Sequence, residues 1–231
     1  MDVGENPLDG KNAETAIEIA TIALQAVPYV GSILSSTASF FLERRKNERL
    51  NKFLVSLADD LKTLEGKINT NFVSTEGFRD LTDDIFTKAS ETRQQEKLDA
   101  LRSIFLNAVL ANNPNYDAVE EITNLIYSWQ ARHIILIKIL YAPHSANMQM
   151  GNIVGNSSGY TTSISTILSK LLPEWDNDQI NRTWSDLYDK KIHRTPSINS
   201  MMTDKGIGQL EGRLTDFGIK IAKYLENPAQ K

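Results

Sequence analysis

The residue types that most often carry enzyme chemistry are present in this chain, but they are not grouped. The three histidines, His133, His144 and His193, lie far apart, and no HxxxH or HExxH spacing brings two of them to one helical face. Cysteine is absent, which excludes thiol nucleophiles, thiolate metal sites and disulfide bonds. We therefore expect no metal site and no cofactor.

Adjacent carboxylates and glycine-rich segments also fail to match a catalytic motif. Neighbouring residues on a helix point about 100° apart, so an adjacent pair does not face one site. We interpret as solvated helix faces the pairs Asp59 and Asp60, Asp83 and Asp84, and Glu120 and Glu121. No GxxxxGK[ST] or GxGxxG element occurs, and the glycines at 206 and 208 are better explained by a turn. The sequence thus predicts a protein that is not an enzyme.

The most informative feature is instead a run without charged residues, from 19 to 42. A helix needs roughly 20 apolar residues to cross a bilayer. Pro28 and Gly31 interrupt the run, because proline removes a helical hydrogen bond. Three interpretations stay open: a kinked membrane span, a hairpin that enters lipid, and a buried hairpin, which the central break favours. The candidate lipid- or partner-binding residues are Ile22, Leu24, Val27, Ile33, Leu34, Phe40 and Phe41.

A basic cluster follows this run directly. Arg44, Arg45 and Arg49 lie within one or two helical turns of its end. Basic residues beside an apolar segment are attracted to an anionic cytoplasmic leaflet by about 1 kcal/mol each. Glu43 and Glu48 partly neutralise the cluster, so an ordinary solvated helix end is the competing interpretation. We add the three arginines to the candidate membrane- or partner-binding residues.

Helical periodicity dominates the elements that follow. Apolar residues at alternating spacings of four and three form a heptad seam, which comprises Leu50, Leu54, Leu57, Leu61, Leu64 and Ile68. We expect this seam to face the core of a helical bundle, and an oligomerisation surface is the alternative. Further helices are predicted over residues 75–89 and 94–110.

The second half of the chain has a different order of elements. An apolar helix ends near Pro143 and is followed by a loop at 144–160, predicted to be mobile because it is rich in Asn, Gly and Ser. A short helix at 161–172 and a helix with an Asp176 capping box come next. In the last helix, Thr215 is the expected N-cap and Gly218 permits close packing against a strand. This order is typical of a winged helix.

Whole-chain composition sets the fold class and compartment. The 231 residues suffice for one large or two small domains, and 41% hydrophobic with 23% charged residues is close to the globular average. We predict a mostly α fold, with a helical bundle and apolar hairpin at 1–115 and a winged-helix-like domain at 116–231. The acidic start, with Asp2, Glu5 and Asp9, is unlike a secretory signal. We therefore expect a cytoplasmic protein, peripheral to the inner membrane.

The order of elements along the chain resembles that of a known family. The residues that carry this resemblance are Glu43 to Arg49, Asp186-Leu187-Tyr188 and Leu214 to Gly218. An apolar segment and a charged helix precede a helical region and a winged-helix-like tail. The chain in this respect resembles the bacterial abortive-infection alpha group of phage-exclusion proteins. The resemblance covers most of the chain, is one of layout, and provides no catalytic residues. It implies a non-enzymatic phage-defence protein that engages the membrane or a protein partner.

Two other functions are open. A winged-helix transcriptional regulator would bind DNA through Arg182, Lys190, Lys191 and Arg194. However, residues 121–231 contain 12 Lys and Arg against 10 Asp and Glu, a net charge of only +2. DNA-binding domains usually carry a stronger positive charge, so we expect a membrane or protein partner in preference to nucleic acid. The third hypothesis is a helical scaffold that forms homo-oligomers through the heptad seam.

Overall fold

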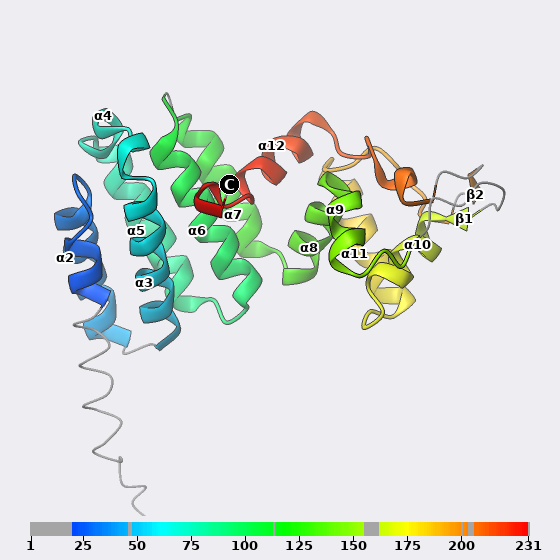
Figure 1. Ribbon diagram of the computed structural model, residues 1–231, viewed down its shortest axis with the longest axis horizontal. Helices are drawn as coiled ribbons and strands as arrows, with labels where there is room; N and C mark the ends of the chain where they lie inside the picture. Colours follow the sequence, from blue (N-terminus) through cyan, green and yellow to red (C-terminus); the bar gives the residue numbers. More distant parts are fainter. Residues whose placement is uncertain are drawn as a thin grey trace, which may run out of the picture. The chain divides into compact units, whose positions relative to one another are not determined.

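The computed structural model describes residues 20–45, 48–112, 114–154, 162–199, 201–202 and 206–230. Helices dominate these residues, which confirms the mostly α prediction (Figure 1). The chain forms two compact units: unit 1 comprises Met1–Ser128 with Glu226–Lys231, and unit 2 comprises Trp129–Leu225. We predicted a domain boundary near residue 115, but the helix from Tyr116 to Ser128 belongs to unit 1.

Unit 1 is a helical bundle. Beyond a helical segment at residues 20–25, its elements are α2 (Gly31–Arg45), α3 (Glu48–Thr63), η1 (Glu65–Lys67), α4 (Thr70–Val73), α5 (Glu76–Glu91), α6 (Gln95–Leu110), α7 (Tyr116–Ser128) and η3 (Pro228–Gln230). Helix α5 contacts α2, α3, α6 and α7 and is therefore central to the bundle. The helices predicted at 75–89 and 94–110 are confirmed as α5 and α6 to within two residues.

Aromatic packing and the heptad seam form the core of unit 1. The ring of Phe86 on α5 lies 6.2 Å from Phe53, 6.4 Å from Phe41 and 6.4 Å from Phe105, so three other helices meet at one side chain. The seam from Leu50 to Ile68 is buried, as expected for a core-facing stripe. These six side chains consequently offer no free surface to a second copy of the chain.

The last residues of the chain return to unit 1. Asn227 Nδ2 donates a hydrogen bond to Asp60 Oδ2 at 2.9 Å, and Asn107 Nδ2 donates to the carbonyl oxygen of Glu226 at 2.9 Å. Asp60 also pairs with Arg102, whose Nε lies 3.2 Å from Oδ2. Contacts between residues so distant in sequence were not predictable from local pattern.

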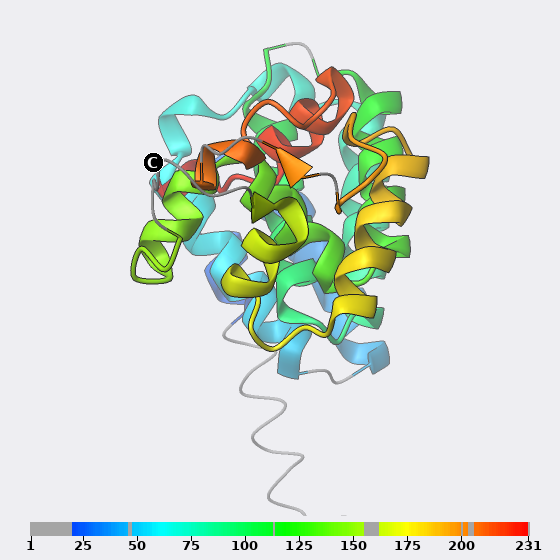
Figure 2. The ribbon, with the colours of Figure 1, turned by 90° about the vertical axis from the view of Figure 1, so that its right-hand side faces the viewer.

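Unit 2 surrounds an apolar helix. Its elements are α8 (Ala131–Tyr141), α9 (Pro143–Gln149), β1 (Thr162–Ser163), α10 (Ile164–Leu171), α11 (Asn177–Asp189), β2 (Met201–Met202), η2 (Gly206–Leu210) and α12 (Asp216–Tyr224). Helices α11 and α12 both pack against α8, and Figure 2 shows α10 and α11 in yellow to gold. Strands β1 and β2 pair antiparallel, with Thr162 opposite Met202, and an isolated bridge joins His193 to Leu214.

Local sequence signals in unit 2 were partly correct. The Asp176 capping box and the Thr215 cap are confirmed, because their side chains accept from the backbone N–H groups of Gln179 and Gly218. The mobile loop predicted at 144–160 is wrong for residues 144–149, which belong to α9. Pro143 starts that helix at a position where its missing N–H costs nothing. Residues 155–161 lie outside the described part. The turn expected at the glycines 206 and 208 is the 3-10 helix η2.

Candidate functional site

The described part of the uncharged run, residues 20–42, folds as a helical hairpin whose second helix, α2, packs chiefly on α5. Residues 26–30 form its turn, in which Tyr29 has a positive φ of 66°. Gly31 begins α2 directly against the preceding helix, where an added Cβ would lie 2.6 Å from the carbonyl oxygen of Leu24. The interruption seen in the sequence is therefore a tight turn, and glycine is required because no side chain fits there.

One face of the hairpin is anchored in the bundle. Leu24, Val27 and Leu34 are buried, and Phe41 packs edge-on against Phe86. Each buried aliphatic side chain contributes about 1.5–3 kcal/mol. These residues hold the hairpin in place and are not exposed for lipid or a partner, which departs from their assignment as binding residues.

Three large apolar side chains of the hairpin are exposed, together with the polar Gln25, Ser32 and Ser36. Ile22 is 64% exposed, Tyr29 66% and Phe40 57%, and Ile33 is half-buried. We call these four residues the outer hairpin face. No charged residue occurs from 20 to 42; the first charges after this face in sequence are Glu43 and Arg44, three and four residues after Phe40 on α2. Tyr29 was missed by the sequence analysis, although an aromatic residue inside a turn is a recognisable signal of exposure.

The serines of α2 do not make this face strongly hydrophilic. Ser36 Oγ donates to the carbonyl oxygen of Ser32 at 2.8 Å, and Ser39 Oγ donates to that of Ser35 at 2.9 Å. Hydroxyl groups bonded to the preceding turn have a partner without water. Their transfer to an apolar surrounding therefore costs less than that of an unpaired hydroxyl.

The basic cluster is described only in part. Arg44 and Arg45 end α2, but their side chains lie outside the described part of the chain. Arg49 is exposed on the first turn of α3. Among the described residues, no helix has the length and apolar character required to cross a bilayer. Residues 20–42 do not form the kinked span that was one interpretation of the sequence, because the turn at 26–30 separates two short helices.

The candidate DNA-binding residues lie on or just after α11, and all four are exposed. Two of them have an acidic partner, and a third lies over an aromatic ring. Arg182 lies 3.8 Å from Asp178, and Arg194 lies 3.2 Å from Asp216. Lys191 Nζ lies 5.1 Å from the ring centre of Tyr188. Together with Lys190 they form no concentrated positive surface.

The three histidines have separate structural partners. His133 Nε2 lies 3.2 Å from Asp186 Oδ2, and His144 Nε2 lies 2.7 Å from Glu211 Oε1. His193 is buried, and its Nε2 donates to the carbonyl oxygen of Trp184 at 2.9 Å. In the described ranges, no group of three or more His, Cys, Asp or Glu side chains is placed to hold a metal ion.

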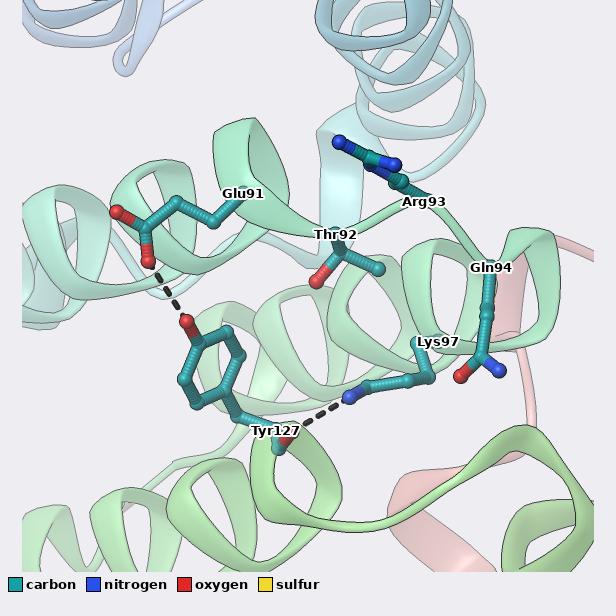
Figure 3. A pocket seen from close by; sticks show the side chains of 6 residues that line it. All are labelled: Glu91, Thr92, Arg93, Gln94, Lys97 and Tyr127. Atoms are coloured by element: carbon teal, nitrogen blue, oxygen red, sulfur yellow. Dashed lines mark hydrogen bonds between the residues drawn. The ribbon is translucent and has the colours of Figure 1, made fainter.

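A cavity of about 470 Å³ lies between the end of α5, the start of α6 and the end of α7 (Figure 3). Tyr127 donates its hydroxyl hydrogen to Glu91 Oε2 at 2.7 Å, and Lys97 Nζ donates to the carbonyl oxygen of Tyr127 at 2.5 Å. Burial lowers the pKa of Lys97. Lys97 is nevertheless engaged with a helix end, so we interpret this cavity as a structural junction of three helices.

The chain matches no protein-family model, no curated protein and no solved structure. Functional inference consequently depends on the surfaces described above. Among these surfaces, the outer hairpin face is the apolar one, and its large side chains are left exposed by the helices of the bundle.

Proposed function

We propose that this chain is a non-enzymatic phage-defence protein that docks unit 1 on the inner membrane through the outer hairpin face. The observation that carries the proposal is the exposure of Ile22, Tyr29 and Phe40 within a segment, residues 20–42, that contains no charged residue. Single exposed apolar residues are common on soluble proteins, but a group of them on an uncharged surface indicates contact with lipid or protein. The resemblance to abortive-infection alpha proteins suggests the biological setting.

The proposed contact is peripheral. Entry of the whole hairpin into lipid would separate Phe41 from Phe86 and uncover the bundle core. Insertion of only the outer side chains leaves Leu24 and Leu34 packed. Aromatic and aliphatic side chains then enter the headgroup boundary, as amphipathic surfaces do at membranes.

The arginines after the hairpin give the contact a preference for anionic lipid. Arg44, Arg45 and Arg49 would each add about 1 kcal/mol near an anionic leaflet. This part of the attraction is screened by salt, whereas the apolar part is not. Binding is therefore expected to be strongest on anionic vesicles at low salt and weaker, but present, on neutral ones.

Vesicle flotation tests the proposal with a matched pair of substitutions. Ser36→Asp adds one negative charge at an exposed position of α2, and Asn124→Asp adds the same charge at an exposed position of α7. We expect Ser36→Asp, and Ile22→Ser combined with Phe40→Ser, to weaken vesicle binding by about tenfold or more. Asn124→Asp should bind like the parent chain. Equal recovery of all variants, or no vesicle binding by the parent, would reject the proposal.

A phage-plating assay then tests the biological setting. Cells that express the parent chain should restrict phage plating, and cells that express the Ile22→Ser, Phe40→Ser variant at the same level should not. If the double variant restricts phage plating as well as the parent chain does, defence does not depend on membrane docking, and the proposed link between the two is wrong.

A winged-helix DNA-binding regulator is the second candidate function. The supporting observation is the order α8, α9, β1, α10, α11 and β2, with the His193–Leu214 bridge where a wing would begin. Lys190→Glu with Lys191→Glu should then abolish duplex binding at low salt. A parent chain that shifts no DNA at low salt excludes this function.

A further inference from the structure

The junction of α5, α6 and α7 contains a cavity with polar walls. Its volume is about 470 Å³, and its lining consists of Glu91, Thr92, Arg93, Gln94, Lys97 and Tyr127. Apart from the ring of Tyr127, every one of these side chains ends in a charged, amide or hydroxyl group. Sites for drug-like ligands measure about 300–1,000 Å³ and are mostly apolar, so polar walls at this size fit a small charged solute. All six residues belong to unit 1. We call this space the junction cavity.

Lys97 brings a positive charge to the junction cavity without a counter-ion. Its Nζ donates to the carbonyl oxygen of Tyr127 at 2.5 Å and lies 5.3 Å from the centre of the Tyr127 ring. In the described part of the chain, no carboxylate pairs with it. Burial lowers the pKa of Lys97, and no carboxylate opposes this shift. A partly buried cation of this kind is stabilised when an anion binds beside it.

A neighbouring ammonium group shows the arrangement that Lys97 lacks. Lys88 Nζ lies 5.8 Å from the centre of the same Tyr127 ring, and it is also paired with Asp84, one turn earlier on α5. Two ammonium groups therefore approach one ring, and of these two only Lys88 has a described carboxylate partner. An aromatic ring and a carbonyl oxygen attract a cation more weakly than an oxyanion does. Lys97 thus keeps the capacity to bind an anion.

Arg93 provides a second cation at the junction cavity. It is exposed in the connection between α5 and α6, and within the described ranges its side chain makes no hydrogen bond or ion pair. Figure 3 shows Arg93 and Lys97 on different sides of Thr92. Glu91 is the one acidic residue of the six, and its Oε2 accepts the hydroxyl hydrogen of Tyr127 at 2.7 Å. Two positive charges against one negative leave the lining at +1, in a chain of net charge −4.

We propose that the junction cavity binds a small solute with two anionic groups, one at Lys97 and the other at Arg93. Ammonium and guanidinium groups bind phosphate and carboxylate oxygens through charge-assisted hydrogen bonds. Because the two cations border different parts of the cavity, an extended oxyanion fits them better than a single small ion. The ligand class is therefore a soluble diphosphate or polycarboxylate. This site is separate from the outer hairpin face and does not depend on membrane docking.

Calorimetric titration of the full chain, without vesicles, tests the proposal. The probes are pyrophosphate and citrate, with sodium chloride at the same ionic strength as the blank. We expect saturable binding of at least one probe with a Kd below about 1 mM. Arg93→Gln and Lys97→Gln should each weaken it by about tenfold, because each removes a charge-assisted hydrogen bond. The control Arg79→Gln removes an exposed cation elsewhere on α5 and should bind like the parent chain.

Lysine acetylation, read by mass spectrometry, locates the bound probe. A low dose of acetic anhydride is applied with and without the probe at saturation. We expect the probe to slow acetylation of Lys97 several-fold and to leave Lys62, which is exposed near the end of α3, unchanged. This measurement uses the parent chain, so it is valid even if Lys97→Gln disturbs the junction of the helices.

The two probes distinguish the sources of the anionic groups. Tighter binding of pyrophosphate assigns the site to phosphorylated solutes, and tighter binding of citrate assigns it to carboxylates. Absence of saturation by both probes up to about 1 mM overturns the proposal. Equal weakening by Arg79→Gln and Arg93→Gln also overturns it, because the attraction is then a diffuse effect of net charge. Equal protection of Lys62 and Lys97 places the anion elsewhere and overturns it as well. None of these results bears on membrane docking, since no lipid is present.

Discussion

Gly218 shows how a single residue sets the packing of unit 2. A Cβ at this position would lie 2.1 Å from the carbonyl oxygen of Ile192. That oxygen is held in place, because it accepts the Thr215 N–H at 2.9 Å. Gly218→Ala must therefore displace α12, and we expect it to lower the free energy of unfolding by about 2–3 kcal/mol. The sequence predicted a close approach at Gly218, which the structure confirms, but the neighbour is a bend at Ile192 and not the expected strand.

Gly77→Ala is the matched control for that substitution. Gly77 lies in α5, and the nearest atom to an added Cβ is Tyr116 Cδ2 at 3.6 Å. Alanine favours the helix over glycine, so this variant should gain about 0.5–1 kcal/mol. Urea unfolding of both variants measures the difference. A Gly218→Ala variant as stable as Gly77→Ala would show that α12 does not pack on Ile192.

His193 gives unit 2 a pH dependence of known sign. Burial lowers the pKa of His193, against the hydrogen bond to the Trp184 carbonyl, and Arg213 lowers it further. The Thr195 N–H donates to Nδ1 at 3.3 Å, so the neutral ring with hydrogen on Nε2 fits the folded state. The unfolded chain takes up the proton near pH 6.5, and stability is therefore lost as the pH falls below about 6.5.

The measurement is the urea midpoint of unit 2 between about pH 7.5 and about pH 5.5. The midpoint should fall with pH in the parent chain and fall less in His193→Gln. The control is His144→Gln, because His144 is exposed and pairs with Glu211 at the surface. Should the two variants show the same slope, His193 would not be the titrating group.

At the scale of elements, Phe86 determines how firmly α2 is held. Its ring contacts Phe41, Phe53 and Phe105, so Phe86→Ala should cost about 3–5 kcal/mol and expose α2 to hydrogen exchange. Phe40→Ala removes the same ring from an exposed position of α2. We expect it to change stability by less than about 1 kcal/mol. Comparable losses would mean that the outer hairpin face is also part of the core.

The same elements show how far the sequence was informative. Helices with a cap and an apolar stripe, such as α5 and α11, were predictable because both signals act within a few residues. Helix α9 was missed because its Asn and Ser content outweighed the Pro143 start signal. The sequence identified the segment that forms the candidate site, but not which of its side chains are exposed. The apolar residues of α2 are spread around its whole circumference, so the sequence of α2 does not show which side is buried. Packing on α5 decides that Leu34 faces inward and Phe40 outward.

At the scale of the whole molecule, the return of residues 226–230 ties the end of the chain to unit 1. Asn227 and Arg102 both approach Asp60 Oδ2, and Asn107 is bonded to Glu226. Removal of residues 226–231 leaves Asp60 without one of its donors. We expect unit 1 to lose about 1–3 kcal/mol, because the carboxylate and the Asn107 amide lose hydrogen bonds. Unit 2 should be unaffected, since these contacts lie within unit 1.

The distribution of tryptophan allows each unit to be followed separately. Trp129, Trp175 and Trp184 are the three tryptophans of the chain, and all lie in unit 2. Their fluorescence reports unit 2 alone, whereas helical circular dichroism reports both units. Truncation should shift part of the dichroism transition to lower denaturant and leave the fluorescence transition in place. Asn227→Ala should give a smaller shift of the same kind. A fluorescence transition that moves by as much as the dichroism would show that the units unfold together, because loss of unit 1 contacts would then destabilise unit 2 equally.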